Sequence, residues 1–214
     1  NLHYPEIAEQ NRERLKDFFT PFKDLDDYLH FTFITGVSKF SQVSIFSGFN
    51  HLDDITMVPD YATMLGYTTE DLQNDFEPYI QRVADTKRTS SEAVLAEIKD
   101  WYNGYRFSKA ETYVYNPFST LKYLKAQEPK GYWYASGTPS FLIHEVQKRP
   151  NITTSLSGMS ASQNKLENAR NIQDIDLAAL MFQTGYLTIQ DWEYDSVLKE
   201  TVYRLDFPNE EVHK

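Results

Sequence analysis

The stretch LHFTFITGVSK, residues 29–39, decides the fold that the sequence predicts. Residues 29–35 are aromatic, aliphatic or β-branched and contain no breaker, which is typical of a buried strand. Gly36 ends the run. Because a continuous apolar run favours a strand that is covered on both faces, we expect residues 29–35 to form the central strand of a small parallel sheet.

Small polar residues and one base follow this predicted strand at Thr35, Ser38 and Lys39. Open α/β sheets bind ligands at the carboxyl ends of their strands. Thr35 or Ser38 could orient a water molecule near a γ-phosphate, and Lys39 could offset phosphate charge. The alternative is that these residues only end the strand and cap the next turn, and the spacing alone favours this alternative.

The sequence predicts an α/β part up to about residue 66. Apolar residues at near-helical spacing indicate a helix over residues 5–25, with Pro5 in its first turn. A second short strand is expected over residues 52–58, where Pro59 stops it. We therefore place one domain at residues 1–66 and a second at residues 67–214.

The second part is expected to be mostly helical and to end in a β-hairpin. Capping residues and apolar spacing predict helices over residues 70–85, 91–102, 117–126, 139–148 and 174–185. Residues 151–172 are rich in Asn, Ser and Thr and favour a loop. Residues 186–191 and 201–206 are predicted to pair as a hairpin. Helices followed by a hairpin suggest, by analogy only, a winged-helix-like or lid domain.

Composition and missing motifs exclude several kinds of chemistry. The chain has 31 acidic and 21 basic residues and a net charge of −10, which disfavours a phosphate backbone as partner. It has no cysteine, no GxxxxGK[ST] phosphate loop and no strand ending in paired acids. Its five histidines are scattered, so no histidine metal site is expected. No run of about 18 apolar residues occurs, so we expect no membrane span.

An aromatic turn at residues 101–107, WYNGYRF, contains the strong turn dipeptide Asn103-Gly104. It could be a platform for a ligand or partner, or a hydrophobic turn that pins two helices, and the second interpretation is favoured. We expect this turn to pack against the helix start at residues 116–118. Glu97 and Lys99 have a nuclease-like spacing, but both lie in a predicted helix, where such a pair is usually a solvated face.

Short motifs in a fixed order resemble the AAA-ATPase-like family of bacterial, notably Bacteroides-type, P-loop proteins of unknown function. The motifs span nearly the whole chain, and they are residues 33–40, 44–50, 54–56, 66–68, 101–105, 115–118, 137–139, 182–187 and 207–212. Their ordered agreement is specific, whereas none of them is specific alone.

The resemblance implies a fragment of a larger ATPase, and the lack of cysteine is compatible with a reducing cytoplasm, where we expect the protein. Family members typically begin with phosphate-binding (Walker A) and magnesium-binding (Walker B) motifs, and this sequence resembles the part that follows them. Many members continue into a PD-(D/E)XK nuclease-like domain after the segment that residues 207–212 match. ATP and Mg²⁺ are therefore implied for the full-length protein and no cofactor for this fragment. Thr35, Ser38 and Lys39 lie where such ATPases place a sensor residue.

Two functions stay open at this point. The chain could supply the sensor and lid regions of a nucleotide-dependent switch, with its own P-loop core as partner. It could instead be a non-catalytic module that binds a protein or recruits DNA for a nuclease-like domain. A phosphate loop preceding Asn1 in the full-length protein would favour the first.

Overall fold

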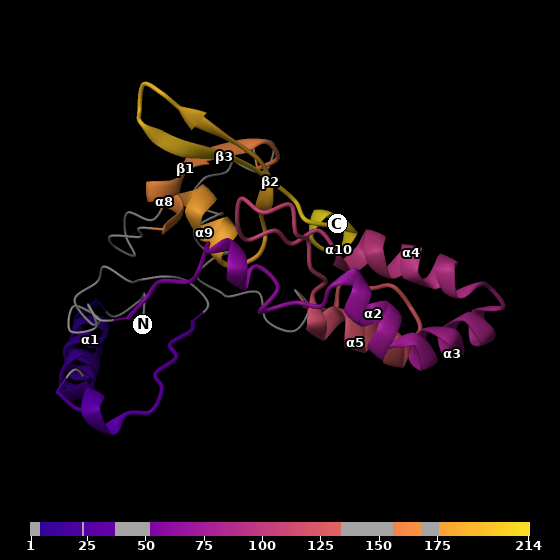
Figure 1. Cartoon of the computed structure of the whole chain (residues 1–214), viewed down its shortest axis with the longest axis horizontal. Coiled ribbons are helices and arrows are strands. Elements are labelled where there is room, and N and C mark those ends of the chain that lie inside the picture. The colour runs from indigo at the N-terminus through magenta and orange to yellow at the C-terminus, as the bar shows by residue number, and fades with distance from the viewer. Residues whose placement is uncertain (1–4, 23, 37–51, 134–155, 168–175) are drawn as a thin grey trace.

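The computed structural model describes residues 5–22, 24–36, 52–133, 156–167 and 176–214 (Figure 1). These residues form a helical part and a part with a small antiparallel sheet. The elements in chain order are α1 (Pro5–Phe19), η1 (Thr20–Phe22), η2 (Asp26–Tyr28), η4 (Pro59–Tyr61), α2 (Thr69–Asp75), α3 (Glu77–Lys87), α4 (Ser91–Tyr102), α5 (Pro117–Ala126), β1 (Met159–Ser162), α8 (Gln163–Glu167), α9 (Leu177–Gln183), β2 (Thr188–Asp195), β3 (Glu200–Asp206) and α10 (Glu210–His213).

The prediction of a central strand at residues 29–35 is wrong. Residues 31–36 are extended, but they belong to no sheet, and the Phe31 and Phe33 side chains are 81% and 50% exposed. A strand exists only where another strand completes its hydrogen bonds, and none of the described strands pairs with this segment. The second predicted strand, at residues 52–58, is replaced by turns that lead into η4.

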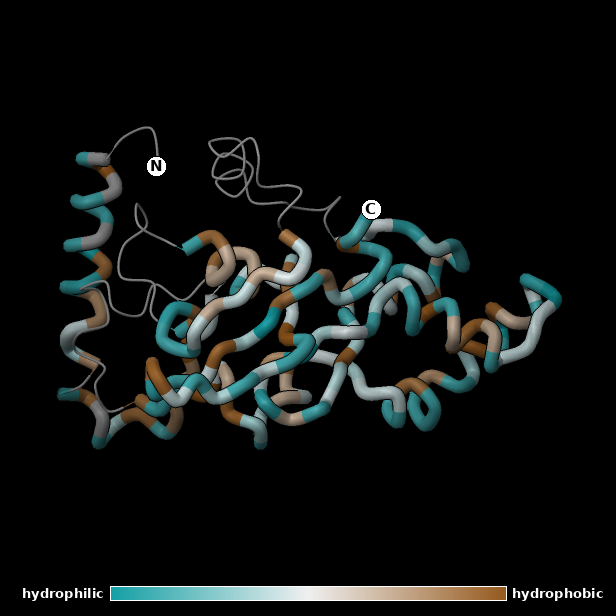
Figure 2. Tube along the Cα trace, turned by 90° about the horizontal axis from the view of Figure 1, so that it is seen from above, coloured by the Kyte–Doolittle hydropathy of each residue, from teal (hydrophilic) through white to brown (hydrophobic). Residues whose placement is uncertain are grey.

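Helix α1 lies to one side of the rest of the chain and mixes hydrophilic and hydrophobic residues along its length (Figure 2). It ends at Phe19, and two short 3-10 helices continue the segment that the sequence predicts as one helix over residues 5–25. Its side chains Ile7, Leu15 and Phe18 are exposed.

Local capping signals set the helices of the helical part. Thr68 and Asp71 form a reciprocal capping box at α2, and Ser90 caps α4. Asn116 caps α5, and Pro117 occupies its first turn. Helices over residues 91–102 and 117–126 are therefore confirmed. The predicted helix over residues 70–85 is two helices, α2 and α3, that meet at Phe76.

Helices α2–α5 share one hydrophobic cluster. Three tyrosines at its centre are fully buried, and they are Tyr102, Tyr115 and Tyr123. Trp101 is only partly buried against this cluster, whereas its neighbour Tyr102 lies inside it. Within the aromatic turn, Tyr102 and Tyr105 are thus core residues, whereas Trp101 is not.

The second cluster lies between the sheet and helices α8 and α9. The sheet has the order β1-β3-β2 and is antiparallel throughout, so the described residues do not contain the parallel sheet that a P-loop core would have. The predicted hairpin is confirmed as β2 and β3. Strand β1 and helix α8 lie within residues 151–172, where the sequence predicts a loop, and α9 is shorter than the predicted helix over residues 174–185. The predicted helix over residues 139–148 lies outside the described residues.

The two clusters meet where the chain after β3 crosses the aromatic turn. Gly104 has a φ of +98°, and a Cβ atom there would lie 1.9 Å from the carbonyl oxygen of Pro208. Only glycine combines this backbone conformation with so close an approach. Asn209 Nδ2 donates to the Asn103 carbonyl oxygen at 2.7 Å and fixes the crossing.

Gly104→Ala should destabilise the protein by roughly 2–4 kcal/mol, because it adds a steric clash to the cost of a left-handed backbone. Gly158→Ala is a matched control, since Gly158 has a φ of +74° and no atom within 4 Å of the added Cβ. The control should cost only about 1–2 kcal/mol. Urea unfolding of both variants measures the difference, and equal losses would contradict the proposed clash.

Candidate functional site

Of the three predicted sensor residues, the described part of the chain contains Thr35 alone. Thr35 lies exposed in the extended segment over residues 31–36. Ser38 and Lys39 lie outside the described residues. Their role therefore stays a prediction from the sequence.

Three asparagines from distant motifs do come together at the junction of the clusters. The Asn116 N–H donates to the Tyr102 carbonyl oxygen at 2.8 Å, and Asn209 Nδ2 donates to the Asn103 carbonyl oxygen. Asn116 Oδ1 and Asn209 Oδ1 also cap α5 and α10, by accepting from backbone N–H groups. The expected packing of the aromatic turn against the start of α5 is thus confirmed, and the segment after β3 joins them.

Glu211 is the buried acid of this junction. Its side chain is 1% exposed, although it lies in the short terminal helix α10. Its Oε1 atom accepts a hydrogen bond from Ser119 Oγ at 2.9 Å and another from the Trp133 N–H at 2.8 Å. One carboxyl group therefore ties α10 to α5 and to the segment that follows α5.

Burial raises the pKa of Glu211, although the bonds from Trp133 and Ser119 act in the opposite direction. Some buried oxygen atoms make no hydrogen bond within the described residues, and they include Asn103 Oδ1, Thr120 Oγ1 and Glu211 Oε2. Buried polar atoms of this kind are usually satisfied by ordered water. The junction is thus a polar interior between two apolar clusters.

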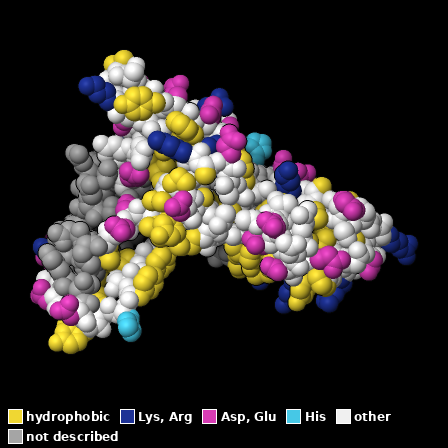
Figure 3. Space-filling model, in the orientation of Figure 1, with side chains coloured by type: hydrophobic (Ala, Val, Ile, Leu, Met, Phe, Trp, Pro, Cys, Tyr) yellow, Lys and Arg dark blue, Asp and Glu magenta, His cyan; other side chains and the backbone are white. Residues whose placement is uncertain are grey.

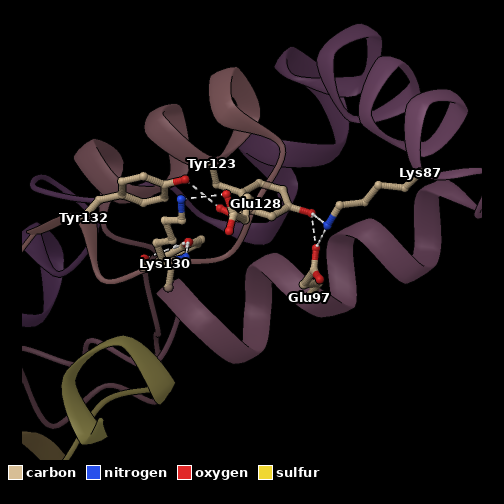
Figure 4. A network of polar contacts seen from close by, with 7 residues as sticks. Lys87, Glu97, Tyr123, Glu128, Lys130 and Tyr132 are labelled. Atoms are coloured by element: carbon tan, nitrogen blue, oxygen red, sulfur yellow. Dashed lines mark hydrogen bonds and ion pairs between the residues drawn. The ribbon is translucent and has the colours of Figure 1, made fainter.

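A second polar network joins helices α3, α4 and α5 (Figure 4). Lys87 and Tyr123 both hydrogen-bond to Glu97 Oε2, and Lys87 Nζ lies 3.2 Å from the Tyr123 hydroxyl. Burial opposes ionisation of Glu97, but the bonds from Lys87 and Tyr123 outweigh it and lower the pKa of the carboxyl group. This network stabilises helix packing, since Glu97 is already engaged by both neighbours.

Arg106 is a buried cation whose guanidinium group, within the described residues, bonds to backbone carbonyl oxygens and to no carboxylate. It donates to the backbone carbonyl oxygens of Ser108, Lys109, Ala110 and Gln190. Its own backbone N–H and carbonyl bond the Thr188 hydroxyl. The side chain therefore fixes the loop after Tyr105 against the start of β2 and is not available to a ligand.

A site for ATP and Mg²⁺ would need groups that bind phosphate and a metal ion. No group of three or more His, Cys, Asp or Glu side chains within the described residues could hold a metal ion. The whole sequence also lacks a phosphate loop. No helix in the described part of the chain is long and apolar enough to cross a membrane.

Sequence reasoning missed Glu211, Ser119 and Arg106 as the polar residues that hold the junction. The motif over residues 207–212 was visible, but its pattern does not tell which of its two glutamates is buried. The asparagine motifs at residues 103 and 116 were a usable signal, because Asn-Gly and Asn-Pro mark a turn and a helix start.

Replacing Glu211 should separate its bonding role from its charge. Glu211→Ala leaves the Ser119 hydroxyl and the Trp133 N–H without their acceptor, so we expect a loss of roughly 2–4 kcal/mol. Glu211→Gln keeps an acceptor and removes the charge. Because the folded-state pKa is raised, wild-type stability should fall as the pH rises above the ordinary value of 4.5, until the folded-state pKa is passed.

The measurement is chemical denaturation of wild type and Glu211→Gln from pH 4 to 8. The variant should gain stability relative to wild type as the pH rises. Glu210→Gln is the control, because the neighbouring Glu210 is exposed. A constant difference between wild type and Glu211→Gln would show that Glu211 is not the group that titrates.

Comparisons with known proteins place the start of the chain in a family. A family model described as "Predicted AAA-ATPase" matches residues 1–46. Over 212 residues the chain is 38% identical to an "Uncharacterized protein in vnfD 5'region" from Azotobacter chroococcum mcd 1. That match covers 99% of this chain but only 38% of the relative, and no solved structure matches. Residues 1–46 of the chain are thus similar to the AAA-ATPase-like family.

Proposed function

We propose that this chain supplies the sensor and lid regions of a nucleotide-dependent switch in a larger AAA-ATPase-like protein. The family match at residues 1–46 supports the link to an ATPase. The length of the relative, of which this chain covers 38%, supports a role as part of a larger protein.

The observation that carries the proposal is the junction of the two clusters. A lid must move as one body, so that a change at one end displaces the other. The contact of Gly104 with Pro208 and the buried bonds of Glu211 link the helical cluster to the end of β3. The helices and the hairpin then act together as a lid, for which a winged-helix-like domain is the nearest analogy.

The amino-terminal segment would connect this lid to the nucleotide site. Thr35 lies exposed at the end of an extended, apolar run whose backbone has no strand partner among the described residues. In the larger protein, a strand of the P-loop core would pair with this run and place Thr35, Ser38 and Lys39 at the carboxyl edge of its sheet. The groups that bind ATP and Mg²⁺ would come from that core.

A second candidate function is a non-catalytic module, attached to a nuclease-like domain, that binds a protein or recruits DNA. Its protein-binding form is the one that the structure favours. The exposed side chains of the hairpin favour it, as they include Trp192, Tyr194, Val197 and Leu198. The full-length sequence discriminates the two, because only a switch needs an intact phosphate loop in front of this chain.

The chain alone should not bind ATP. The reason is the lack of a phosphate loop and of a metal-binding group of acids within its described residues. Isothermal titration with ATP and Mg²⁺ measures this directly. Binding at a single site in the micromolar range would contradict the assignment of the nucleotide site to another part of the protein.

In the full-length protein, Thr35→Val should slow ATP turnover by roughly 10–100-fold while nucleotide affinity changes little, because an oriented hydroxyl acts mainly in the transition state. Ser38→Ala tests the second hydroxyl in the same way. Thr63→Val is the control, since Thr63 is also exposed but lies outside the predicted sensor. Turnover unchanged in both test variants would remove the sensor role.

A further inference from the structure

The distal half of the β2–β3 hairpin, residues 191–200, extends beyond the core of the sheet, and we call it the hairpin arm. The base of the hairpin is buried, as Thr188, Ile189 and Leu205 show. From Asp191 onward most side chains of β2 are exposed. Figure 3 shows hydrophobic side chains on this projecting part of the molecule, with both acidic and basic side chains among them.

One face of the arm is aromatic. Trp192 pairs with Tyr203 and Tyr194 pairs with Thr201, and side chains of directly paired residues lie on the same face of a sheet. Trp192 and Tyr194 are 41% and 62% exposed, whereas Tyr203 and Thr201 are buried. The aromatic face thus continues the core face of the sheet outward into solvent.

The tip of the arm presents two exposed aliphatic side chains. Val197 and Leu198 are 87% and 61% exposed. Their turn is held in place, because Asp195 Oδ1 accepts from the Val197 and Leu198 N–H groups at 2.8 and 2.9 Å. Hairpin turns are ordinarily polar, so an ordered turn that presents two aliphatic side chains is a candidate contact surface.

The rim of the arm is acidic. Four carboxylates lie on it, and they are Asp191, Glu193, Asp195 and Glu200. Lys199 is the sole base within residues 191–200. Asp191 Oδ1 also accepts a hydrogen bond from the Trp192 N–H. That backbone donor of the edge strand β2 is therefore less available to pair with an added strand. Recognition at the arm must therefore depend mainly on side chains.

The chain itself shows which group this face accepts. Lys109 Nζ lies 5.1 Å from the centre of the Trp192 ring and donates to Thr201 Oγ1 at 2.8 Å. An ammonium group over an aromatic ring with a hydroxyl acceptor beside it is a favourable arrangement. Tyr194 is the next residue of β2 on the same face, two positions along the chain. Its ring could contact a basic side chain of another molecule in a similar way.

We propose that the hairpin arm is a docking surface for a polypeptide segment that carries both lysine or arginine and apolar side chains. The apolar side chains cover Trp192, Tyr194 and Leu198, and the basic groups contact Glu193 and its neighbouring carboxylates. This role goes beyond the sensor and lid function and does not require ATP binding.

Charge disfavours the other occupants. A second copy docked arm to arm would bring acidic rims together, and like charges across a contact are costly. Nucleic acid would bring phosphates against the same carboxylates. A basic and apolar polypeptide is the partner whose charge complements the arm.

The test uses the full chain and a fluorescein-labelled peptide, Lys-Val-Lys-Phe-Lys-Val-Lys, in an anisotropy titration. We expect saturable binding of the peptide to the wild-type chain. The double variant Trp192→Ala/Tyr194→Ala should weaken the affinity by roughly tenfold or more, as the loss of hot-spot side chains does. Glu193→Lys should weaken binding similarly and also reduce its dependence on salt. Because these residues are exposed, the substitutions should leave the fold intact, and circular dichroism of each variant checks this.

Matched controls lie outside the arm. Tyr61→Ala removes an equally exposed ring, and Asp53→Lys reverses an exposed charge, so both should leave the affinity unchanged. The proposal is overturned if the peptide does not bind, or if the arm and control variants lose affinity equally. Arm-dependent self-association in sedimentation, or arm-dependent binding of duplex DNA, would overturn it in favour of those occupants.

Discussion

The buried carboxyl group of Glu211 is the interaction on which the described architecture depends. It accepts from Ser119 in α5 and from the Trp133 backbone, while its own helix follows directly after the last strand. The helical cluster and the sheet cluster have separate hydrophobic cores. Directional bonds from one acid, together with the crossing at Gly104, fix their relative position where apolar packing alone would leave it free.

Burying this carboxyl group costs stability, but its hydrogen bonds select one relative position of the two clusters. Taking a carboxyl group out of water raises its pKa and penalises its charged form. A well-packed apolar residue could be as stable, but it would not select one geometry among neighbouring alternatives. The same reasoning applies to Arg106, whose guanidinium group is satisfied by backbone carbonyls that only this loop conformation presents together.

The hairpin arm and the amino-terminal segment share a property that points to partners. Both place large apolar side chains in solvent, as Phe31 and Tyr194 illustrate. They differ in charge and in backbone. The arm is a hairpin with an acidic rim, whereas the amino-terminal run pairs with no strand among the described residues. This difference favours separate partners, a strand of the proposed P-loop core for the run and a basic segment for the arm.

What the sequence determined by itself is the local structure. Ser90 and Asn116 predicted the starts of α4 and α5, because a cap needs only the backbone N–H groups of the next turn. The hairpin of β2 and β3 was also predictable, since its strands are neighbours in the chain. Residues 29–35 were mispredicted because a strand needs a distant partner, and β1 was missed because its Ser-rich sequence becomes a strand only beside β3. Tertiary structure alone decided that Glu211 is buried and Glu210 exposed, because burial depends on which face of α10 meets α5.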